Sequence, residues 1–341
     1  MYGEKILLPV LYMIMNNDTF KILLNAFPGK IRVNEPLARF TTFKIGGPAD
    51  LFFEAQTKQE LVDVLVLARK NSIPVFVLGG GTNILISDKG IRGLVVKNST
   101  RHIVTRAALG TVQKGKVSRR VFVEAESGAI FNTLVRYTVD EGLKGLEMHL
   151  GLPGTVGGAI YMNSKWTHPI AYVGDVLYQA EILTQSGEQK IVPQRYFHFG
   201  YDKSSLQKTK DIVLTVTFAL EKEDKERLWG IANESIKYRQ STQPQGVFTA
   251  GCTFRNVPQS TVLSLGLPKE ATSAGFLIDH VGLKGKIIGD AQISSVHANF
   301  IVNKGHARYS DVIELINIAK ENVKKQFGVV LEEEIQRAGE L

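Results

Sequence analysis

The chain has 341 residues, of which 44% are hydrophobic and 22% are charged. These values are typical of a globular protein and exclude a disordered, a collagenous and a wholly coiled-coil chain. The length predicts two or three domains. The single cysteine, Cys252, excludes an internal disulfide and favours a reducing compartment.

The formal net charge is +8, and much of it lies between residues 97 and 120, where no acidic residue occurs. The basic residues of this stretch are Lys97, Arg101, Arg106, Lys114, Lys116, Arg119 and Arg120. Such a surplus can attract nucleic acid, nucleotide phosphates or acidic substrates. No aromatic residues interleave with the basic ones, so the pattern favours a solvated basic hairpin.

An apolar run extends from Ile6 to Met15 and is interrupted by Pro9. It is shorter than the ~20 residues that a membrane-spanning helix needs. We expect a short extension, or a true start at Met13 or Met15. No other segment approaches membrane length, so a cytoplasmic location is expected.

The first part of the chain predicts a strand, a helix, a second strand and a glycine-rich loop. Residues 42–55 are typical of a loop followed by a strand, and Thr57 and Glu60 form a capping box before a helical apolar ladder. Residues 75–78 predict a short buried strand that leads directly into Gly79–Asn83.

The rest of the chain alternates between strand and helix patterns. Alternating residues predict strands within 91–126, turning near Gly110 and Gly115. The further predictions are a helix at 130–141 ended by Gly142, strands near 176–184 and 211–220, a helix from 224, a strand at 251–256, a helix at 273–281 and a final helix capped by Ser310 and ended by Gly328. The fold class is therefore α+β, in three parts divided near residues 90 and 223.

Two glycine-rich loops, Gly79–Asn83 and Gly151–Ala159, fit neither common phosphate-binding fingerprint. Clustered glycines beside strands nevertheless allow a backbone to approach a pyrophosphate closely, with N–H groups as donors. Taken alone, each loop is as readily explained as an ordinary tight turn as it is by a phosphate site. Two such loops in a positively charged chain favour a dinucleotide or a nucleotide diphosphate.

Few other residues form a recognisable catalytic pattern. The seven histidines have no metal-ligand spacing, and no serine-hydrolase elbow occurs, so we expect no metal site. Cys252 stands between Gly251 and Thr253 and is either a small buried hydrophobe or a functional thiol. A thiol, with an ordinary pKa of roughly 8.5, can also donate a proton.

Five motifs occur in an order that identifies a family. They are Thr42-Phe-Lys-Ile-Gly-Gly47, Leu78-Gly-Gly-Gly-Thr-Asn-Ile-Leu85, Gly145-Leu-Glu147 with Gly151-Leu-Pro-Gly-Thr-Val-Gly-Gly158, Ala250-Gly-Cys-Thr-Phe-Arg-Asn256, and Ala274-Gly-Phe-Leu-Ile278 followed by Gly285 and Gly289. From about Ile31 to its end the chain resembles the UDP-N-acetylenolpyruvoylglucosamine reductases, and is closer to the shorter subtype. These are flavoenzymes of bacterial peptidoglycan precursor synthesis.

The resemblance implies a two-part FAD-binding module of the vanillyl-alcohol-oxidase-like type, followed by a C-terminal α/β substrate-binding domain. The implied division is 1–30 as an N-terminal extension and first helix, 31–90 and 91–223 as the two FAD-binding subdomains, 224–328 as the substrate domain, and 329–341 as a segment that returns to the active site. The implied FAD-binding residues are Thr42, Gly46, Gly47, Gly79, Gly80, Gly81, Thr82, Asn83, Ile84, Gly154, Thr155, Gly157 and Gly158.

The implied chemistry has two half-reactions. NADPH reduces FAD, and the reduced flavin gives a hydride to the β-carbon of an enolpyruvyl ether, which leaves negative charge to be stabilised before the α-carbon is protonated. Cys252 stands where the family has its proton-donating serine, and Glu334, before Ile335, matches a catalytic glutamate. Arg239 and Asn256 match residues that meet the substrate.

The sequence departs from the family pattern in three places. The family's Tyr-Arg-x-Ser occurs here as Tyr201-Asp202-Lys203-Ser204. The family arginine helps to polarise the enolpyruvyl group. Asp202 has the wrong charge for that task, whereas Lys203 can supply a cation, as a point charge without a bidentate fork. Residues 163–169 replace a different family loop, and residues 257–272 are an insertion.

Two alternatives remain open at this stage. The altered segments at 163–169 and 201–204 also suit a related FAD oxidoreductase with another substrate. The basic stretch at 97–120 also suits a nucleic-acid-binding protein without enzymatic activity. The favoured hypothesis is an NADPH-dependent, FAD-containing enzyme that binds a small UDP-sugar, with no nucleic-acid or membrane partner and with a monomeric state.

Overall fold

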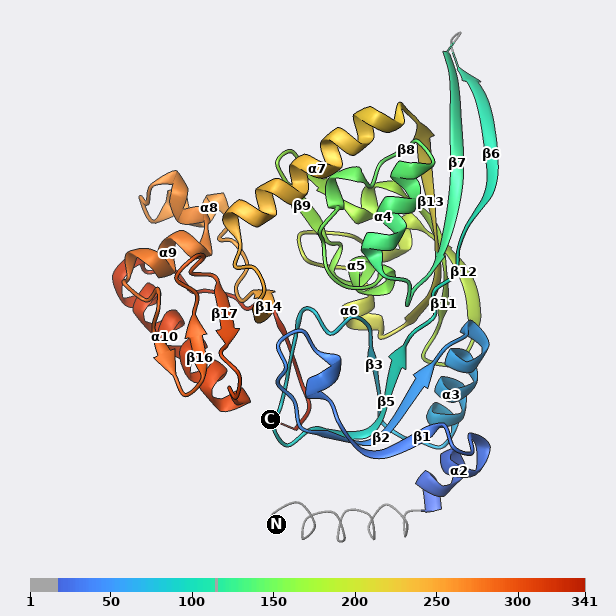
Figure 1. The fold of residues 1–341 in the computed structure, drawn as a ribbon, viewed down its shortest axis with the longest axis horizontal. Coiled ribbons are helices and arrows are strands. Elements are labelled where there is room, and N and C mark those ends of the chain that lie inside the picture. The colour runs from blue at the N-terminus through green and yellow to red at the C-terminus, as the bar shows by residue number, and fades with distance from the viewer. Residues whose placement is uncertain (1–17, 114–115, 341) are drawn as a thin grey trace. The chain divides into compact units, whose positions relative to one another are not determined.

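A computed structural model describes residues 18–113 and 116–340. The expectations for the apolar N-terminal run, its start sites, Lys114 and Gly115 lie outside these residues. By internal contacts the chain divides into two units. Unit 1 contains residues 1–33, 51–80 and 93–239, and unit 2 contains residues 34–50, 81–92 and 240–341. The elements are labelled in Figure 1.

A four-stranded sheet has the order β1 (Ile31–Pro36), β2 (Pro48–Ala55), β5 (Ile91–Asn98) and β3 (Val75–Leu78). Helix α3 (Lys58–Lys70) buries Leu61, Val64, Leu65 and Ala68, and α2 (Asp18–Ala26) precedes the sheet. The Thr57 hydroxyl caps α3 by accepting from the Glu60 N–H, as the sequence predicts.

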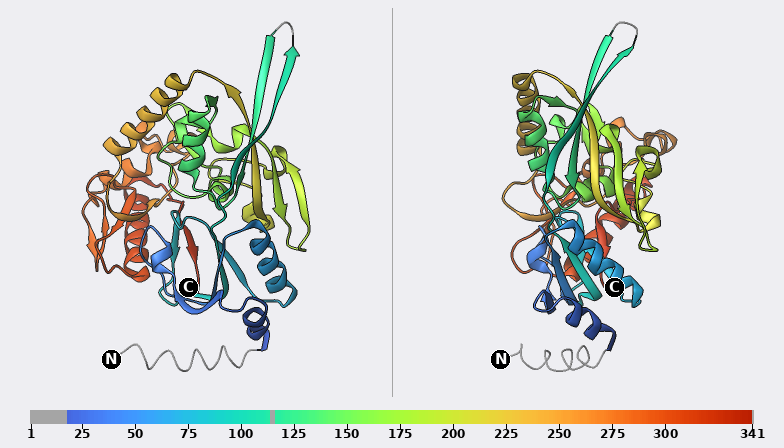
Figure 2. Two further views of the ribbon diagram at one scale, coloured as in Figure 1. Left: turned by 45° about the vertical axis from the view of Figure 1, so that its right-hand side comes forward. Right: turned by 90° about the vertical axis from the view of Figure 1, so that its right-hand side faces the viewer.

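The larger sheet of unit 1 contains a long hairpin, β6 (Ile103–Gln113) and β7 (Lys116–Glu126), that extends beyond its other strands (Figure 2). The order is β12 (Gln189–Pro193), β11 (Leu177–Leu183), β13 (Ile212–Lys222), β7 and β6, and β8 (Leu143–Lys144) also pairs with β13. A separate hairpin joins β9 (Lys165–Thr167) to β10 (Ile170–Tyr172).

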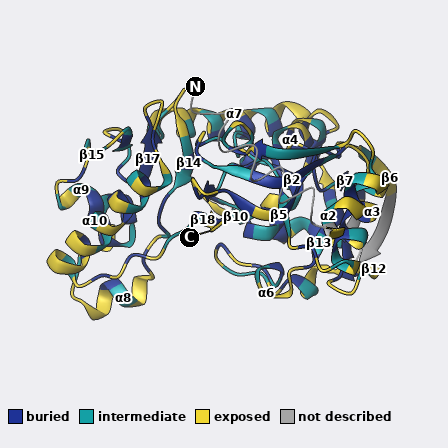
Figure 3. Ribbon diagram, turned by 90° about the horizontal axis from the view of Figure 1, so that it is seen from below, coloured by how far each residue is buried: buried dark blue, intermediate teal, exposed yellow. Residues whose placement is uncertain are grey.

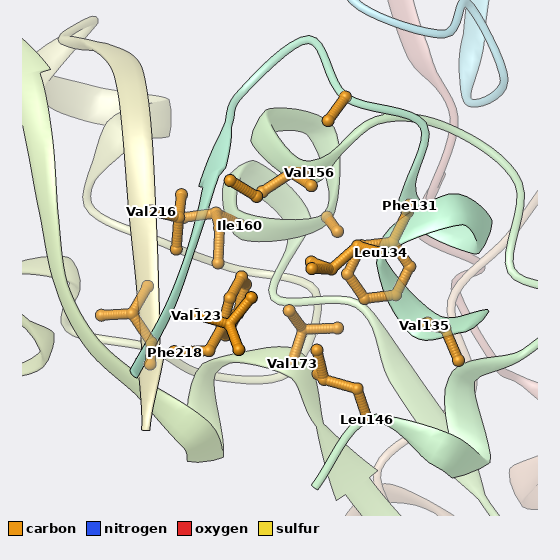
Figure 4. Packing of buried hydrophobic residues seen from close by; sticks show 14 of the residues in the cluster. Val123, Phe131, Leu134, Val135, Leu146, Val156, Ile160, Val173, Val216 and Phe218 are labelled. Atoms are coloured by element: carbon orange, nitrogen blue, oxygen red, sulfur yellow. The ribbon is translucent and has the colours of Figure 1, made fainter. Parts of the chain in front are cut away.

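Further helices are α4 (Phe131–Asp140), α5 (Val156–Met162), α6 (Leu206–Thr209) and α7 (Lys225–Thr242), with short 3-10 turns at Glu147–His149, Val173–Val176 and Gln194–Phe197. Phe131 and Leu134 of α4 and Ile160 of α5 pack with Val216 and Phe218 of β13 in one apolar core (Figure 4). This core positions the start of α5, where the second glycine-rich loop lies.

Unit 2 has an antiparallel sheet in the order β14 (Phe248–Cys252), β17 (Phe300–Asn303), β16 (Ala291–Ile293) and β15 (Ile287–Ile288). A parallel pair joins β4 (Ile84–Ile86) to β18 (Gln336–Ala338). The helices are α8 (Gln259–Ser264), α9 (Ala274–His280) and α10 (Tyr309–Phe327), with 3-10 turns at Ala38–Phe40 and Lys269–Thr272. Helix α10 has a buried and an exposed side (Figure 3).

Most predicted elements are confirmed, and a few are wrong at their ends. The last helix begins at Tyr309, before Ser310, and the Asp311 carboxylate accepts from the Arg308 N–H at its start, so Ser310 is not the cap. The strand predicted at 251–256 ends at Cys252, because the chain bends at Thr253. The sequence patterns did not predict strands β1, β4, β8, β9, β10, β12, β15, β16, β17 and β18, or helices α5, α6 and α8. The division near residues 90 and 223 stays a prediction.

No helix among residues 18–113 and 116–340 is long and apolar enough to cross a membrane.

Candidate functional site

The first glycine-rich loop offers backbone donors for an anion. Within the part of the chain that the structure describes, the N–H groups of Gly80, Gly81 and Thr82 donate to no protein acceptor. Gly79 approaches Thr155 so closely that a Cβ built on Gly79 would lie 2.7 Å from the Thr155 hydroxyl oxygen. Two glycine-rich segments from distant parts of the chain therefore meet at this loop, which fits a pyrophosphate-binding backbone.

The second glycine-rich segment opens α5. The Thr155 hydroxyl accepts from the Gly158 N–H at 3.3 Å, and the Gly157 N–H donates to the Ser127 carbonyl at 2.7 Å. Gly154 adopts a positive φ of 115°, which a glycine tolerates readily. Because these N–H groups are occupied by the protein, the open donors belong mainly to Gly80–Thr82.

A cation lies behind the first loop. Lys97, on β5, donates from its ammonium to the Gly79 carbonyl oxygen. Burial lowers the pKa of Lys97, and Glu54 partly opposes that effect. The sequence pattern grouped Lys97 with a solvated basic hairpin. That grouping is wrong for Lys97, because its ammonium is bonded to the loop and partly removed from solvent.

In unit 2, Thr42 ties the loop to the strand that carries the cysteine. Its N–H donates to the Gly81 carbonyl at 3.0 Å, and its hydroxyl donates to the Thr249 carbonyl at 2.7 Å. Gly47 has a packing reason to be glycine, because a Cβ there would lie 2.1 Å from the Asp88 carbonyl oxygen. Gly46 has a φ of 148°, with a would-be Cβ 3.0 Å from Ile86.

Cys252 is the last residue of β14 and is half-buried. The Thr253 N–H donates to the Asn299 carbonyl at 2.7 Å, and the Asn299 side chain bonds both the N–H and the carbonyl of Phe254, at 2.8 and 2.7 Å. The backbone that follows the thiol is therefore held on both sides of the bend.

Glu334 is brought next to this bend from the end of the chain. Its N–H donates to the Thr253 carbonyl at 2.9 Å, and its own carbonyl accepts from the Asn83 side chain at 3.3 Å. The contacts of Asn83 and of the Glu334 backbone thus lie around the stretch that follows Cys252 in unit 2. Asn256 is exposed four residues beyond Cys252, where its side-chain oxygen accepts from the Ala274 N–H at 3.4 Å.

Arg239 lies near the end of α7 in unit 1. Its guanidinium carbon lies 5.2 Å from the centre of the Trp166 ring, a cation–π arrangement. Its aliphatic stem packs over Gly151, where a Cβ would lie 3.0 Å from Cδ of Arg239.

Two of the departures from the family pattern meet in one ion pair. Lys165, from the altered 163–169 segment, contacts both carboxylate oxygens of Asp202, at 2.7 and 2.9 Å. The side chains of Lys165 and Asp202 are only 14% and 4% exposed. The charge of Asp202 is therefore balanced by Lys165, whereas Lys203 is exposed on the same turn. No sequence pattern links positions 165 and 202.

His149 is a residue that sequence reasoning missed. It is 1% exposed, and neither ring nitrogen has a hydrogen-bond partner among the described residues. Burial, followed by the nearby Arg239 charge, lowers its pKa from 6.5 to about 4. The sequence signal that could have identified His149 is its position between apolar residues at 148 and 150.

Comparisons with known proteins define the class. Residues 49–192 match the protein-family model described as "FAD binding domain", which makes the chain an FAD-binding protein. Residues 243–338 match "UDP-N-acetylenolpyruvoylglucosamine reductase, C-terminal domain".

Reductases of that name are similar to almost the whole chain. The one from Caldanaerobacter subterraneus subsp. tengcongensis is 37% identical over 316 residues, which covers 92% of this chain and 95% of the relative. The one from Listeria innocua is 36% identical over 313 residues, covering 91% and 95%. The crystal structure from Thermus caldophilus, at 32% identity, gives a TM-score of 0.69 and covers 90% of this chain and 98% of that chain.

The chain belongs to the UDP-N-acetylenolpyruvoylglucosamine reductase family. It is an FAD-containing oxidoreductase that reduces UDP-N-acetylglucosamine enolpyruvate to UDP-N-acetylmuramate with NADPH, in peptidoglycan precursor synthesis. The predicted fold class, activity and cofactors are confirmed.

Gly79→Ala is expected to weaken FAD binding at least about tenfold, which is ~1.4 kcal/mol. The added methyl group would collide with the Thr155 hydroxyl at 2.7 Å and push the two glycine-rich segments apart. The FAD content of purified protein and titration of apoprotein with FAD measure this effect. Gly230→Ala is the control, because a Cβ there meets nothing within 4 Å. Full FAD retention by Gly79→Ala would show that the close approach is dispensable.

The depressed pKa of His149 predicts a pH-dependent stability. The unfolded chain takes up this proton near pH 6.5, whereas the folded chain does so near pH 4, so stability falls as the pH drops through that window. The shift amounts to a loss on the order of 3 kcal/mol. His149→Leu should flatten this part of the curve of unfolding free energy against pH, measured with urea. An unchanged slope in His149→Leu would rule out this residue as its source.

Proposed function

We propose that Cys252 is the proton donor of this reductase and that Glu334 assists it. The observation that carries the proposal is the hydrogen bond from the Glu334 N–H to the carbonyl of Thr253, the residue after Cys252. It joins the backbone of Glu334 to the residue that follows Cys252, which supports a shared role, since thiol and carboxyl groups can both take part in proton transfer.

Bound FAD supplies the hydride chemistry between NADPH and the enolpyruvyl double bond. The residues of the chain stabilise the developing charge and transfer protons. When the β-carbon has accepted the hydride, negative charge develops on the α-carbon and its carboxylate. The Cys252 thiol gives its proton to the α-carbon, and the resulting thiolate is later reprotonated from solvent. A thiol is more acidic than the alcohol that the family pattern has there, so the replacement is chemically competent.

Glu334 orients or polarises the reacting group. Its backbone is held on both sides, by the Thr253 carbonyl and by the Asn83 side chain, which supports a fixed position for its carboxyl group. A group held by its surroundings needs no reorganisation in the transition state.

The substrate is an anion, and Arg239, Lys203 and Asn256 are proposed to bind it. An unpaired Asp202 carboxylate would repel such a substrate. Its pairing with Lys165 removes that obstacle, so Lys203 on the same turn contributes its charge without a competing neighbour.

The FAD-binding set is likewise a proposal. The unsatisfied amides of Gly80–Thr82 and the close approach of Gly79 to Thr155 support the pyrophosphate as the group held there. The remaining members are Thr42, Gly46, Gly47, Asn83, Ile84, Gly154, Gly157 and Gly158. We also propose that the protein is a cytoplasmic monomer and that its domains divide at residues 30, 90, 223 and 328.

Cys252→Ala is expected to slow reoxidation of the reduced flavin by substrate about 10²- to 10⁴-fold, because a general acid is lost. Reduction of the flavin by NADPH should be unchanged. Anaerobic stopped-flow measurement of the flavin absorbance separates the two half-reactions. Cys252→Ser is the matched control and should keep substantial activity. Near-full reoxidation by Cys252→Ala would refute the proton-donor role.

Lys203→Met is expected to raise the KM for the UDP-sugar roughly fivefold, since an exposed charge contributes about 1 kcal/mol. The dependence of KM on salt should also weaken, because exposed charges are screened. Steady-state kinetics at two ionic strengths measures both effects. Lys208→Met, at another exposed lysine of the same region, is the control. Equal KM values for the two variants would exclude Lys203 from substrate binding.

A further inference from the structure

Three consecutive glutamates, Glu332–Glu334, precede Ile335 in the C-terminal segment. A run of identical residues does not define its own register, since a slip by one residue presents the same side chain at each position. In an extended segment such a slip also exchanges the two faces. Something outside the run must therefore select which glutamate lies beside Cys252.

The buried residues at both ends of the run indicate which face each glutamate occupies. Leu331 and Ile335 are 2% and 4% exposed and belong to the apolar core of unit 2. Residues two apart in an extended segment share a face, so Glu333 lies on the core side between them. Glu332 is 76% exposed, and Glu334 lies on the side opposite to Glu333.

Glu333 is clamped on that core side by two cations. Lys320, on α10, contacts its Oε1 atom, and the Arg337 guanidinium makes two hydrogen bonds, Nε to Oε2 at 2.7 Å and Nη2 to Oε1 at 2.5 Å. The side chains of Glu333, Arg337 and Lys320 are 15%, 29% and 34% exposed. Burial would raise the pKa of Glu333, but hydrogen bonds from Arg337 and Lys320 bring the pKa below its ordinary value.

The backbone hydrogen bonds of the segment agree with the register that this clamp selects. Glu333 faces Phe254 in an antiparallel bridge, the Arg255 N–H donates to the Glu332 carbonyl at 2.9 Å, and the Gln336 N–H donates to the Asn83 carbonyl at 3.0 Å. Lys320 belongs to a long helix and does not move with the segment. Among the contacts to the three glutamates, the Lys320 ion pair is therefore the one that depends on which glutamate faces α10.

We propose that Glu333 is a positioning residue, which, clamped by Lys320 and Arg337, fixes the register that places Glu334 beside the Cys252–Thr253 stretch. The inference rests on the proposed role of Glu334. Glu333 itself stays on the core side and touches no reacting group.

The experiment compares Glu333→Gln, Lys320→Met, Glu334→Gln and, as a matched control, the exposed Glu332→Gln. For Glu333→Gln we expect reoxidation of the reduced flavin by UDP-N-acetylglucosamine enolpyruvate to slow roughly 10- to 100-fold, the scale of a small misplacement of a catalytic group. FAD content, the rate of reduction by NADPH and the substrate KM should stay within about twofold of the parent values.

Lys320→Met should reproduce the defect, and the double variant with Glu333→Gln should be no slower than either single variant, because the two residues act as one unit. Glu332→Gln should match the parent protein. Normal reoxidation by both Glu333→Gln and Lys320→Met, beside a slow Glu334→Gln, would overturn the inference and leave the proposed function standing. Loss of FAD, or equal slowing of both half-reactions, would overturn it in favour of a general structural role. Normal reoxidation by Glu334→Gln would refute the role of Glu334 and the inference with it.

Discussion

The hydrogen bond from the Glu334 N–H to the Thr253 carbonyl is the contact on which the arrangement of unit 2 around Cys252 depends. It joins the end of β14 to a segment 80 residues later, directly after the chain bends away from the cysteine. The Asn299 side chain holds the other side of the bend, and Asn83 bonds the Glu334 carbonyl. Three distant segments thus hold the backbone next to Cys252 and at Glu334, and a rigid backbone is the support that the proposed proton transfer needs.

Local patterns predicted most of the long helices and the longer strands of the fold. The capping residue Thr57, the strand Val75–Leu78 and the C-terminal stop at Gly328 all depend on neighbours within a few residues, so the sequence contains their cause. Two of the errors originate in distant contacts. Strand β18 has only three residues and exists because β4 pairs with it, and β14 ends at Cys252 because Asn299 and Glu334 hold the bend.

The candidate site likewise has some features that the sequence shows and others that only the structure shows. Glycine clustering at Gly79–Asn83 and Gly154–Gly158 is visible in the sequence, and the two segments do meet at Gly79 and Thr155. The Lys165–Asp202 pair is not visible, since 37 positions separate the two residues and no sequence pattern links them. Taken alone, Asp202 would weaken an anion-binding site. Together Lys165 and Asp202 bury a neutral pair, and breaking it by removing one partner would cost far more than either change suggests.

The most direct measurement is a crystal structure of the protein with FAD and UDP-N-acetylglucosamine enolpyruvate bound. The account predicts that the Cys252 sulfur lies within about 3.5 Å of the α-carbon of the enolpyruvyl group, the separation of a near-attack geometry, with the Glu334 carboxyl group in contact with the same group. A complex in which the sulfur faces away from the substrate, with another proton donor at the α-carbon, would contradict it.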